Sequence, residues 1–441
     1  MRSTGWRTCW TRHLREVGNI IHGMKTWLTY LAAAAMGLAF QATFKESSFF
    51  YSSMNFMASI VLKLGVFIVF PLVLFAMTSG TSSLARKKGE NGFVWLSSFF
   101  WSLLTTVTMS IAAALVFKAV PASFPLANAS SVQGKSLCDA FMELTSSRLS
   151  LANPLSANAF LNLVKSSDSL LPVMFLAVVF GYAIRPTSEV MRPAYQVLNS
   201  ISEAMFRLAR QTAKVLWIAV FFVAGTWCET LWLNGTVFSS WRFITMLCVA
   251  GFGTFLIIVP LIYAIATGFK RNPYRQITRL LSAATAAFFS VNSLFAMPAL
   301  YTDCRINLGI RKNVVSTSIP IHSILTKGGS AMMGTLCSCS LVLAATGAMP
   351  TILETVTIAL ACTAVSFVSS LHSGYEVLFC VSCALGLLGK DVAGGAESMI
   401  GMLPLVNGMA LLFDTLLSGL GTSFTACNLG ADCNIVENDT V

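Results

Sequence analysis

Three charged side chains lie inside otherwise apolar stretches in the second half of the chain: Lys327, Glu376 and Asp414. A charge at the centre of a membrane costs at least about 2.5–3.5 kcal/mol, so such a residue is normally paired or functional. Either carboxylate can pair with Lys327, bind a substrate ammonium group, or take up a proton because burial disfavours its charged form. Each residue also has a structural alternative. Lys327 can reach the surface from a helix end, Glu376 can lie on an exposed rim of a hairpin, and Asp414 can cap a helix.

Small and polar residues gather in the same half of the chain and form a second group of candidates. Their hydroxyls, amides and freed backbone groups can hold the carboxylate of a small substrate, and helix N-termini add partial positive charge. The alternative for each serine or threonine is a bond back to its own helix, and for each histidine a structural role. The candidates are Asn292, Ser293, Ser330, Ser369, Ser370, His372, Gly374, Thr422 and Thr425 for substrate, with Thr326 beside Lys327.

The composition places these residues in a membrane protein with many spans. Of the 441 residues, 55% are hydrophobic and 11% are charged, and the mean hydropathy is +0.73. A soluble domain carries roughly a quarter charged residues. The composition therefore excludes a soluble enzyme core, a disordered chain, a disulfide-rich miniprotein and a basic nucleic-acid module.

The net charge of +11 is explained by where the basic residues lie. They precede the first apolar run and recur after every second one, at Arg86 to Lys88, at Arg185 and Arg192, and at Lys270 and Arg271. This is the pattern that orients helices with basic loops inside. It predicts a multi-pass protein of the cytoplasmic membrane that contacts anionic lipid, with no nucleic-acid partner.

The sequence favours binding over catalysis. The twelve cysteines show no paired metal-ligand spacing, and those inside apolar runs are interpreted as packing residues. The sequence contains no Ser/His/Asp grouping or phosphate-binding loop that would indicate a catalytic site. We expect no enzyme activity, no metal site and no cofactor.

Long apolar runs predict helices rather than a barrel, because each is long enough to cross a bilayer with about 20 residues. A loop with short helical pieces is expected over 121–160. The basic head and apolar stretch of residues 1–43 resemble a signal peptide, but we expect a retained first helix, with Met24 as an alternative start to Met1. The first six spans are expected near 26–43, 53–80, 93–120, 166–184, 196–232 and 241–268.

Beyond Arg275 the apolar runs are interrupted. Residues 278–313, closed by Pro298, hold two short arms around Ser290 to Ser293, and residues 351–390 hold two around Ser366 to Gly374, which predicts re-entrant hairpins. Spans are expected at 314–348, broken near Thr326 to Ser330, and at 395–428, broken by Ser418, Gly419, Gly421 and Thr422. Ordinary spans with small residues for close packing are the alternative. Paired interrupted segments are the best sequence indication of a transporter binding site.

The order of these features resembles the dicarboxylate/amino acid:cation symporter family, the glutamate-transporter homologues. The resemblance covers nearly the whole chain, and each motif is degenerate. The stretches that carry it are Lys63 to Val73 with its Pro-Leu-Val ending, Asn153-Pro154 followed by Leu171-Pro172 and Gly181, Thr285 to Ser293 running to Pro298, and Ser318-Ile-Pro320 ten residues before Gly329-Ser330-Ala331.

The resemblance implies eight transmembrane helices, two re-entrant hairpins and a homotrimer with an elevator-type movement. It implies a secondary-active symporter that carries a small amino acid or dicarboxylate, coupled to sodium or protons. The implied parts are scaffold spans in 1–92, a transport-domain span in 93–120, an external loop with scaffold spans in 121–232, the rest of the transport domain in 233–428, and a cytoplasmic tail in 429–441.

Two departures from the family pattern concern ions and substrate. Thr326 to Ser330 stands where the family has Asn-Met-Asp-Gly-Thr, so Gly328 replaces a sodium-coordinating acidic residue and Lys327 replaces the methionine. With Asp414 on the family's first aspartate of the last span, Gly421 stands in place of the substrate-binding arginine. One hypothesis is that the Lys327 ammonium occupies the place of a bound sodium ion.

These departures leave two alternatives to the symporter. The first is a sodium-independent or proton-coupled carrier of a neutral substrate. The second is a non-transporting receptor that has kept the fold.

Overall fold

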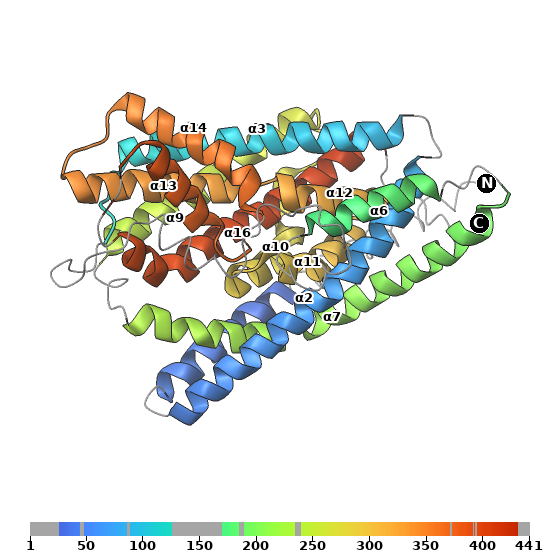
Figure 1. Cartoon of the computed structure of the whole chain (residues 1–441), viewed down its shortest axis with the longest axis horizontal. Helices are drawn as coiled ribbons and strands as arrows, with labels where there is room; N and C mark the ends of the chain where they lie inside the picture. Colours follow the sequence, from blue (N-terminus) through green and yellow to red (C-terminus); the bar gives the residue numbers. More distant parts are fainter. Residues whose placement is uncertain are drawn as a thin grey trace, which may run out of the picture.

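The computed structural model describes residues 26–44, 48–85, 89–125, 170–184, 189–233, 240–370, 373–390, 392 and 395–430. Throughout this part of the chain the regular elements are helices (Figure 1). Most of the expected 121–160 loop, the Asn153-Pro154 motif, His372 and the residues after 430 lie outside the described residues.

The helices follow the expected spans to within a few residues at most ends. In the described ranges, seven segments are long and apolar enough to cross a membrane by length and composition. In chain order the helices are one over residues 26–43, α2 (Ser48–Leu84), α3 (Glu90–Ala119), α6 (Leu171–Ala183), α7 (Arg192–Leu233), α9 (Trp241–Ala266), α10 (Pro273–Ser290), α11 (Ser293–Thr302), the π-helical turn η1 (Asp303–Asn307), α12 (Lys312–Leu325), α13 (Gly328–Thr346), α14 (Ile352–Ser369), α15 (Glu376–Leu387) and α16 (Gly395–Asn428).

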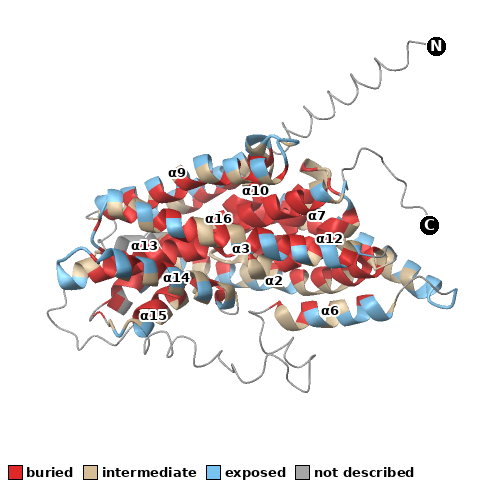
Figure 2. Ribbon diagram, turned by 90° about the horizontal axis from the view of Figure 1, so that it is seen from above, coloured by how far each residue is buried: buried red, intermediate tan, exposed pale blue. Residues whose placement is uncertain are grey.

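The outer surface is apolar and the interior is rich in hydroxyls. Large apolar side chains point outwards from three long helices: Phe67 of α2 is 72% exposed, Leu115 of α3 is 66% exposed and Ile257 of α9 is 69% exposed. In contrast, buried residues gather along α16 and its neighbours (Figure 2). An apolar exterior around a core that is largely apolar but also holds many buried hydroxyls suits a lipid surrounding. The expectation of an all-helical membrane protein is confirmed.

The first helical hairpin consists of α10 and α11. Its turn is at Val291, in the left-handed region with φ 50°, and Asn292, whose side chain accepts from the N–H groups of Leu294 at 2.9 Å and Phe295 at 3.3 Å. This amide therefore caps α11 and fixes the turn where the sequence predicts it. Pro298 lies inside α11 rather than closing the hairpin. As the sixth residue of α11, Pro298 lies past the first turn, so its missing N–H leaves the Leu294 carbonyl without its intrahelical partner.

The second helical hairpin consists of α14 and α15. Thr351 and Glu354 form a capping box at the start of α14. Glu354 also forms an ion pair with Lys390, which follows α15. The two open ends of the hairpin are thus tied together, and its tip lies at the other end, around Ser373 and Gly374.

The predicted break after α12 is confirmed, whereas the predicted break in the last span is wrong. α12 ends at Leu325 and α13 begins at Gly328. α16 continues through the Ser418 to Thr422 cluster without interruption. There the hydroxyls bond to carbonyls one turn earlier, Ser418 to Asp414 at 2.7 Å and Thr422 to Ser418 at 3.0 Å, which keeps the helix intact.

The small residues in this cluster instead permit close packing. A Cβ on Gly421 would lie 2.4 Å from His322 Cε1 and 2.5 Å from Trp101 Cδ1. Position 421 therefore faces α12 and α3 without room for a side chain.

Candidate functional site

The two hairpin tips meet. Ser373 Oγ, at the tip of the second hairpin, donates to Asn292 Oδ1, at the tip of the first, at 3.3 Å. Next to Ser373, Gly374 has φ 92°, a left-handed conformation that glycine adopts without strain. The two tips, whose contacting residues are 81 positions apart in the chain, are therefore in direct contact.

A buried glutamate follows the second tip directly. Glu376 is the first residue of α15 and has no exposed surface, at 0%. Its Oε2 accepts from the Gly374 N–H at 2.9 Å and from Asn407 Nδ2 of α16 at 2.8 Å. Among the described residues, none donates a hydrogen bond to Glu376 Oε1. A buried carboxylate oxygen without a donor is costly unless a ligand or a proton satisfies it.

The second buried carboxylate holds the broken helix in place. Asp414 of α16 accepts from the Gly329 N–H at 2.7 Å, and from Ser330 through both its N–H at 3.3 Å and its Oγ at 2.6 Å. The carboxylate thus sits at the N-terminus of α13, where the helix dipole favours negative charge. Asp414 therefore caps a helix, which was the structural alternative for this residue. Its carboxylate can still be charged and balance Lys327 while it makes these bonds.

Lys327 interacts electrostatically with both of these carboxylates, Glu376 and Asp414. It occupies the N-cap position of α13 and is 1% exposed. The alternative in which Lys327 reaches the surface does not describe this structure, nor does an exposed rim describe Glu376. The structure therefore brings together the three charged residues that the sequence singles out.

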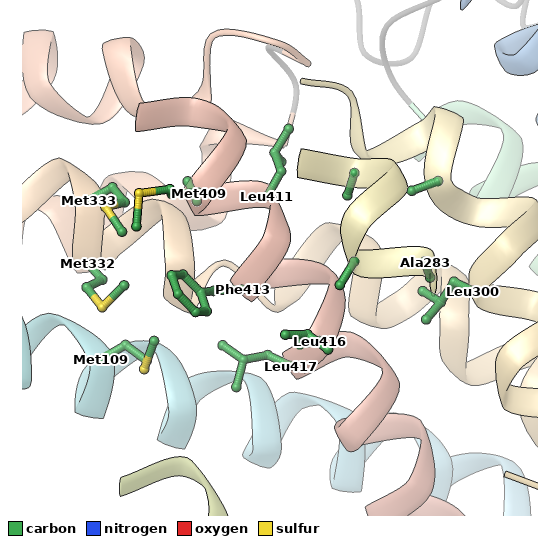
Figure 3. Packing of buried hydrophobic residues seen from close by; sticks show 14 of the residues in the cluster. Met109, Ala283, Leu300, Met332, Met333, Met409, Leu411, Phe413, Leu416 and Leu417 are labelled. Carbon is green, nitrogen blue, oxygen red and sulfur yellow. The ribbon is translucent and has the colours of Figure 1, made fainter. Parts of the chain in front are cut away.

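Apolar side chains surround the break between α12 and α13. Met109 of α3, Met332 of α13, and Phe413 and Leu417 of α16 are buried and lie near one another (Figure 3). A Cβ on Gly328 would lie 2.7 Å from Leu417 Cδ1. Because this surrounding has a low dielectric constant, the charges interact strongly and a missing partner is expensive.

The remaining predicted residues fall into two groups. Near the tips, Ser369 and Ser370 bond to carbonyls within α14, and Ser293 is half-buried at the start of α11. Further along, Thr422 contacts Ser318 and Thr425 contacts Ser97, both at 3.3 Å. Thr422 lies about 22 Å along α16 from Asn407, at 1.5 Å per residue. The structure does not bring Thr422 and Thr425 to the tips.

Thr326, the other predicted coupling residue, faces away from the tips. Its hydroxyl contacts Ser102 Oγ of α3 at 2.7 Å and His322 Nδ1 of α12 at 2.9 Å. These bonds anchor the break to α3. Thr326 therefore supports the backbone next to Lys327, and its hydroxyl is engaged by α3 and α12 rather than by the buried carboxylates.

Asn407 is not among the residues that the sequence singles out, and Ser373 belongs to the predicted polar cluster of the second hairpin without being predicted as a site residue. Asn407 is an amide inside an apolar run, which is a recognisable signal, but an amide at that place is equally typical of helix packing. Across the described ranges, no group of three or more His, Cys, Asp or Glu side chains is arranged to hold a metal ion.

A buried polar cluster between two hairpin tips, a broken helix and a long helix, all within an apolar exterior, is the arrangement of a membrane carrier. The chain belongs to the sodium:dicarboxylate symporter family, whose sequence pattern matches residues 26–393. The family resemblance seen in the sequence is thereby confirmed. The protein is a multi-pass membrane protein of a transporter family and not a member of an enzyme family.

The chain is similar to several known transporters at low identity. It is 24% identical over 311 residues to the neutral amino acid transporter B(0) of Oryctolagus cuniculus, a match that spans 63% of this chain and 56% of that protein. It is 25% identical over 276 residues to the serine/threonine transporter SstT of Streptococcus thermophilus, across 61% of this chain and 63% of that protein. With SstT of Bifidobacterium adolescentis it shares 24% identity over 334 residues, across 74% and 71%.

Proposed function

We propose that the protein is a secondary-active carrier of a small neutral amino acid, which binds where the two hairpin tips meet. The observation that carries this proposal is the Ser373–Asn292 contact beside the buried Glu376–Asn407 pair. These contacts bring polar groups of both hairpins and of α16 together in one buried cluster. Relatives named as neutral amino acid and serine/threonine transporters support the substrate class.

A neutral side chain on the substrate also agrees with the charges of α16. No arginine or lysine occurs anywhere in residues 395–441. A carboxylate on the substrate side chain would find no cation on that helix and would compete with Glu376 and Asp414 for Lys327, and a buried charge without a partner is costly. A dicarboxylate is therefore the less favoured of the two predicted substrate classes.

The proposed movement is that of an elevator. The helix over 26–43, α2, α6 and α7 would form a static scaffold, and α3, α9 and everything from α10 to α16 would carry the substrate. Three copies of the chain would form a homotrimer through the scaffold. Coupling to sodium or protons follows the family, and the binding of substrate between the tips would permit the loaded part to move.

Counterflow in proteoliposomes tests this function. Purified protein is reconstituted with unlabelled serine, alanine, aspartate or succinate inside, and uptake of the same labelled compound is measured. We expect exchange of serine and alanine, and none of succinate. An Asn407→Leu variant should lose exchange, whereas Thr245→Ala, at an exposed hydroxyl bonded within α9, should retain it. Binding without exchange would instead favour a receptor.

A further inference from the structure

The buried cluster carries an unequal number of charges. Lys327 supplies one ammonium, and Glu376 and Asp414 supply two carboxylates, all three at 3% exposure or less. Lys327 interacts electrostatically with both carboxylates, and the carboxylates interact with each other. With all three ionised, the cluster has a formal excess of one negative charge, and burial makes that excess costly.

The two carboxylates differ in how well they are satisfied. Both oxygens of Asp414 accept hydrogen bonds, Oδ1 from the Gly329 N–H at 2.7 Å and Oδ2 from Ser330 Oγ at 2.6 Å. Glu376 has donors on Oε2 alone, and no described residue donates to its Oε1. Glu376 is therefore the carboxylate that has an oxygen without a donor, and we assign the excess negative charge of the cluster to it.

A metal cation fits this place poorly. Hard cations take several oxygen ligands, and the described residues contain no group of three His, Cys, Asp or Glu side chains that could hold one. Lys327 repels any second cation, so charge alone does not decide between a metal ion and an ammonium group. An alkylammonium group fits better because a single acceptor such as Glu376 Oε1 satisfies one of its three N–H donors, whereas a metal ion needs several oxygens at once.

We propose that Lys327 is a built-in counter-cation that balances Asp414 in place of a bound metal ion, and that Glu376 Oε1 binds the ammonium group of the amino-acid substrate. This inference rests on the proposed function, since it names how that function's substrate is recognised. Substrate then completes the charge balance of the cluster, and its affinity does not depend on sodium. The α-ammonium also becomes the feature that distinguishes an amino acid from a hydroxy acid.

Equilibrium binding of labelled serine to the purified wild-type protein tests the role of Lys327. Binding is measured in sodium chloride and in choline chloride at equal ionic strength. We expect dissociation constants within about twofold of each other. Lys327→Met should weaken binding at least about tenfold in choline, and Lys327→Arg should restore most of it. A wild-type affinity that falls about tenfold or more without sodium overturns the inference.

Lys312→Met is the matched control. Lys312 is also buried, at 4% exposure, but lies at the start of α12 and pairs with Glu203 at 3.3 Å. Its loss should leave the response to sodium unchanged. If Lys327→Met does not fold, the proposal is tested by the wild-type affinities in the two salts and by the Glu376 variant described below.

Selectivity tests the role of Glu376. Serine is compared with glycerate, which has a hydroxyl in place of the ammonium. Glu376→Gln keeps the size of the side chain and one acceptor oxygen for Gly374 and Asn407, but it removes the charge and puts an NH2 donor in the place of Oε1. It should therefore lower serine affinity about tenfold or more while leaving glycerate affinity nearly unchanged. Unaltered serine affinity in Glu376→Gln overturns the assignment.

Failure of the inference is distinguishable from failure of the proposed function. If the wild type exchanges no amino acid in counterflow, the proposed function fails. If it exchanges serine but strictly requires sodium, the proposed function stands and the counter-cation assignment alone is overturned.

Discussion

Asn407 of α16 holds both the side chain and the backbone at the start of α15. Its Nδ2 donates to Glu376 Oε2 at 2.8 Å, and its Oδ1 accepts from the Val377 N–H at 3.1 Å. One amide therefore joins the last helix to the arm of the second hairpin that follows the tip. This link connects the position of the hairpin to the position of the buried carboxylate.

Substitution of Asn407 should weaken substrate binding. Asn407→Ala leaves the Val377 N–H without its acceptor and removes one of two donors to Glu376, and each such loss costs about 1–3 kcal/mol. We expect serine affinity to fall by about tenfold to a hundredfold in equilibrium binding. Asn407→Asp keeps the acceptor but places a carboxylate against Glu376, so it should bind no better than Asn407→Ala. Wild-type affinity in either variant would contradict this relationship.

The contact between the tips should control how often the second hairpin opens. Ser373→Ala removes the Oγ donor to Asn292 but leaves the capping bonds of Asn292 to α11 intact. We expect faster hydrogen–deuterium exchange at the tip and little change in thermal stability. Ser370→Ala, at a hydroxyl that bonds within α14, is the control. Equal exchange in both variants would mean that the tip contact does not hold the hairpin closed.

The close approach of α13 to α16 predicts a position where even one methyl group is not tolerated. A Cβ on Gly329 would lie 2.2 Å from the Ala410 carbonyl oxygen and 2.9 Å from Phe413 Cβ. Because a backbone atom cannot rotate away, Gly329→Ala should cost about 3 kcal/mol or more. Gly253→Ala in α9, where nothing lies within 4 Å, should be neutral or stabilising. Thermal unfolding in detergent compares the two, and similar stabilities would refute the expected clash.

Asp303 should make stability depend on pH. It lies in η1, outside the long apolar segments, borders a cavity of ≈ 270 Å³, and accepts hydrogen bonds from Ser282 and the Ala283 N–H. Burial raises the pKa of Asp303 from 3.8 to about 7, and these hydrogen bonds partly oppose the shift. Since the folded state then binds the proton more tightly, stability is greatest below about pH 4 and falls as pH rises to about 7.

An Asp303→Asn variant isolates that contribution. It stays neutral at every pH but retains an oxygen that accepts from Ser282. Unfolding temperatures measured from about pH 4 to about pH 8 should fall less steeply in the variant than in the wild type, and the two should differ most at the higher pH. Identical slopes would show that Asp303 does not titrate in this window.

Much of this arrangement follows from sequence because helices in a membrane must satisfy their own backbone. Polar clusters inside apolar runs therefore mark where helices end, and both the Val291–Asn292 turn and the Thr326–Lys327 break lie where the sequence predicts them. The buried Lys327 was recognisable for the same reason, since an isolated charge in an apolar stretch needs a partner. The number of spans and the elevator movement stay predictions.

The rest depended on contacts that one sequence does not specify. Ser418 to Thr422 contains the same residue types as a helix break, yet its hydroxyls bond back to the helix and its glycines fit against neighbouring helices. Asn407 reaches the tips and Thr422 does not, because the position of α16 along its own axis is set by packing on α10, α12 and α13. Residue type identifies a candidate, whereas tertiary packing decides which candidates meet.

The ion pair between Glu354 and Lys390 has a mechanical consequence for the second hairpin. It fastens the ends of α14 and α15 that lie farthest from Ser373, at two side chains that remain about one-third exposed, at 32% and 33%. We expect an opening movement to begin at the tip, where the Ser373–Asn292 contact breaks, while the ion pair keeps the far ends of α14 and α15 together.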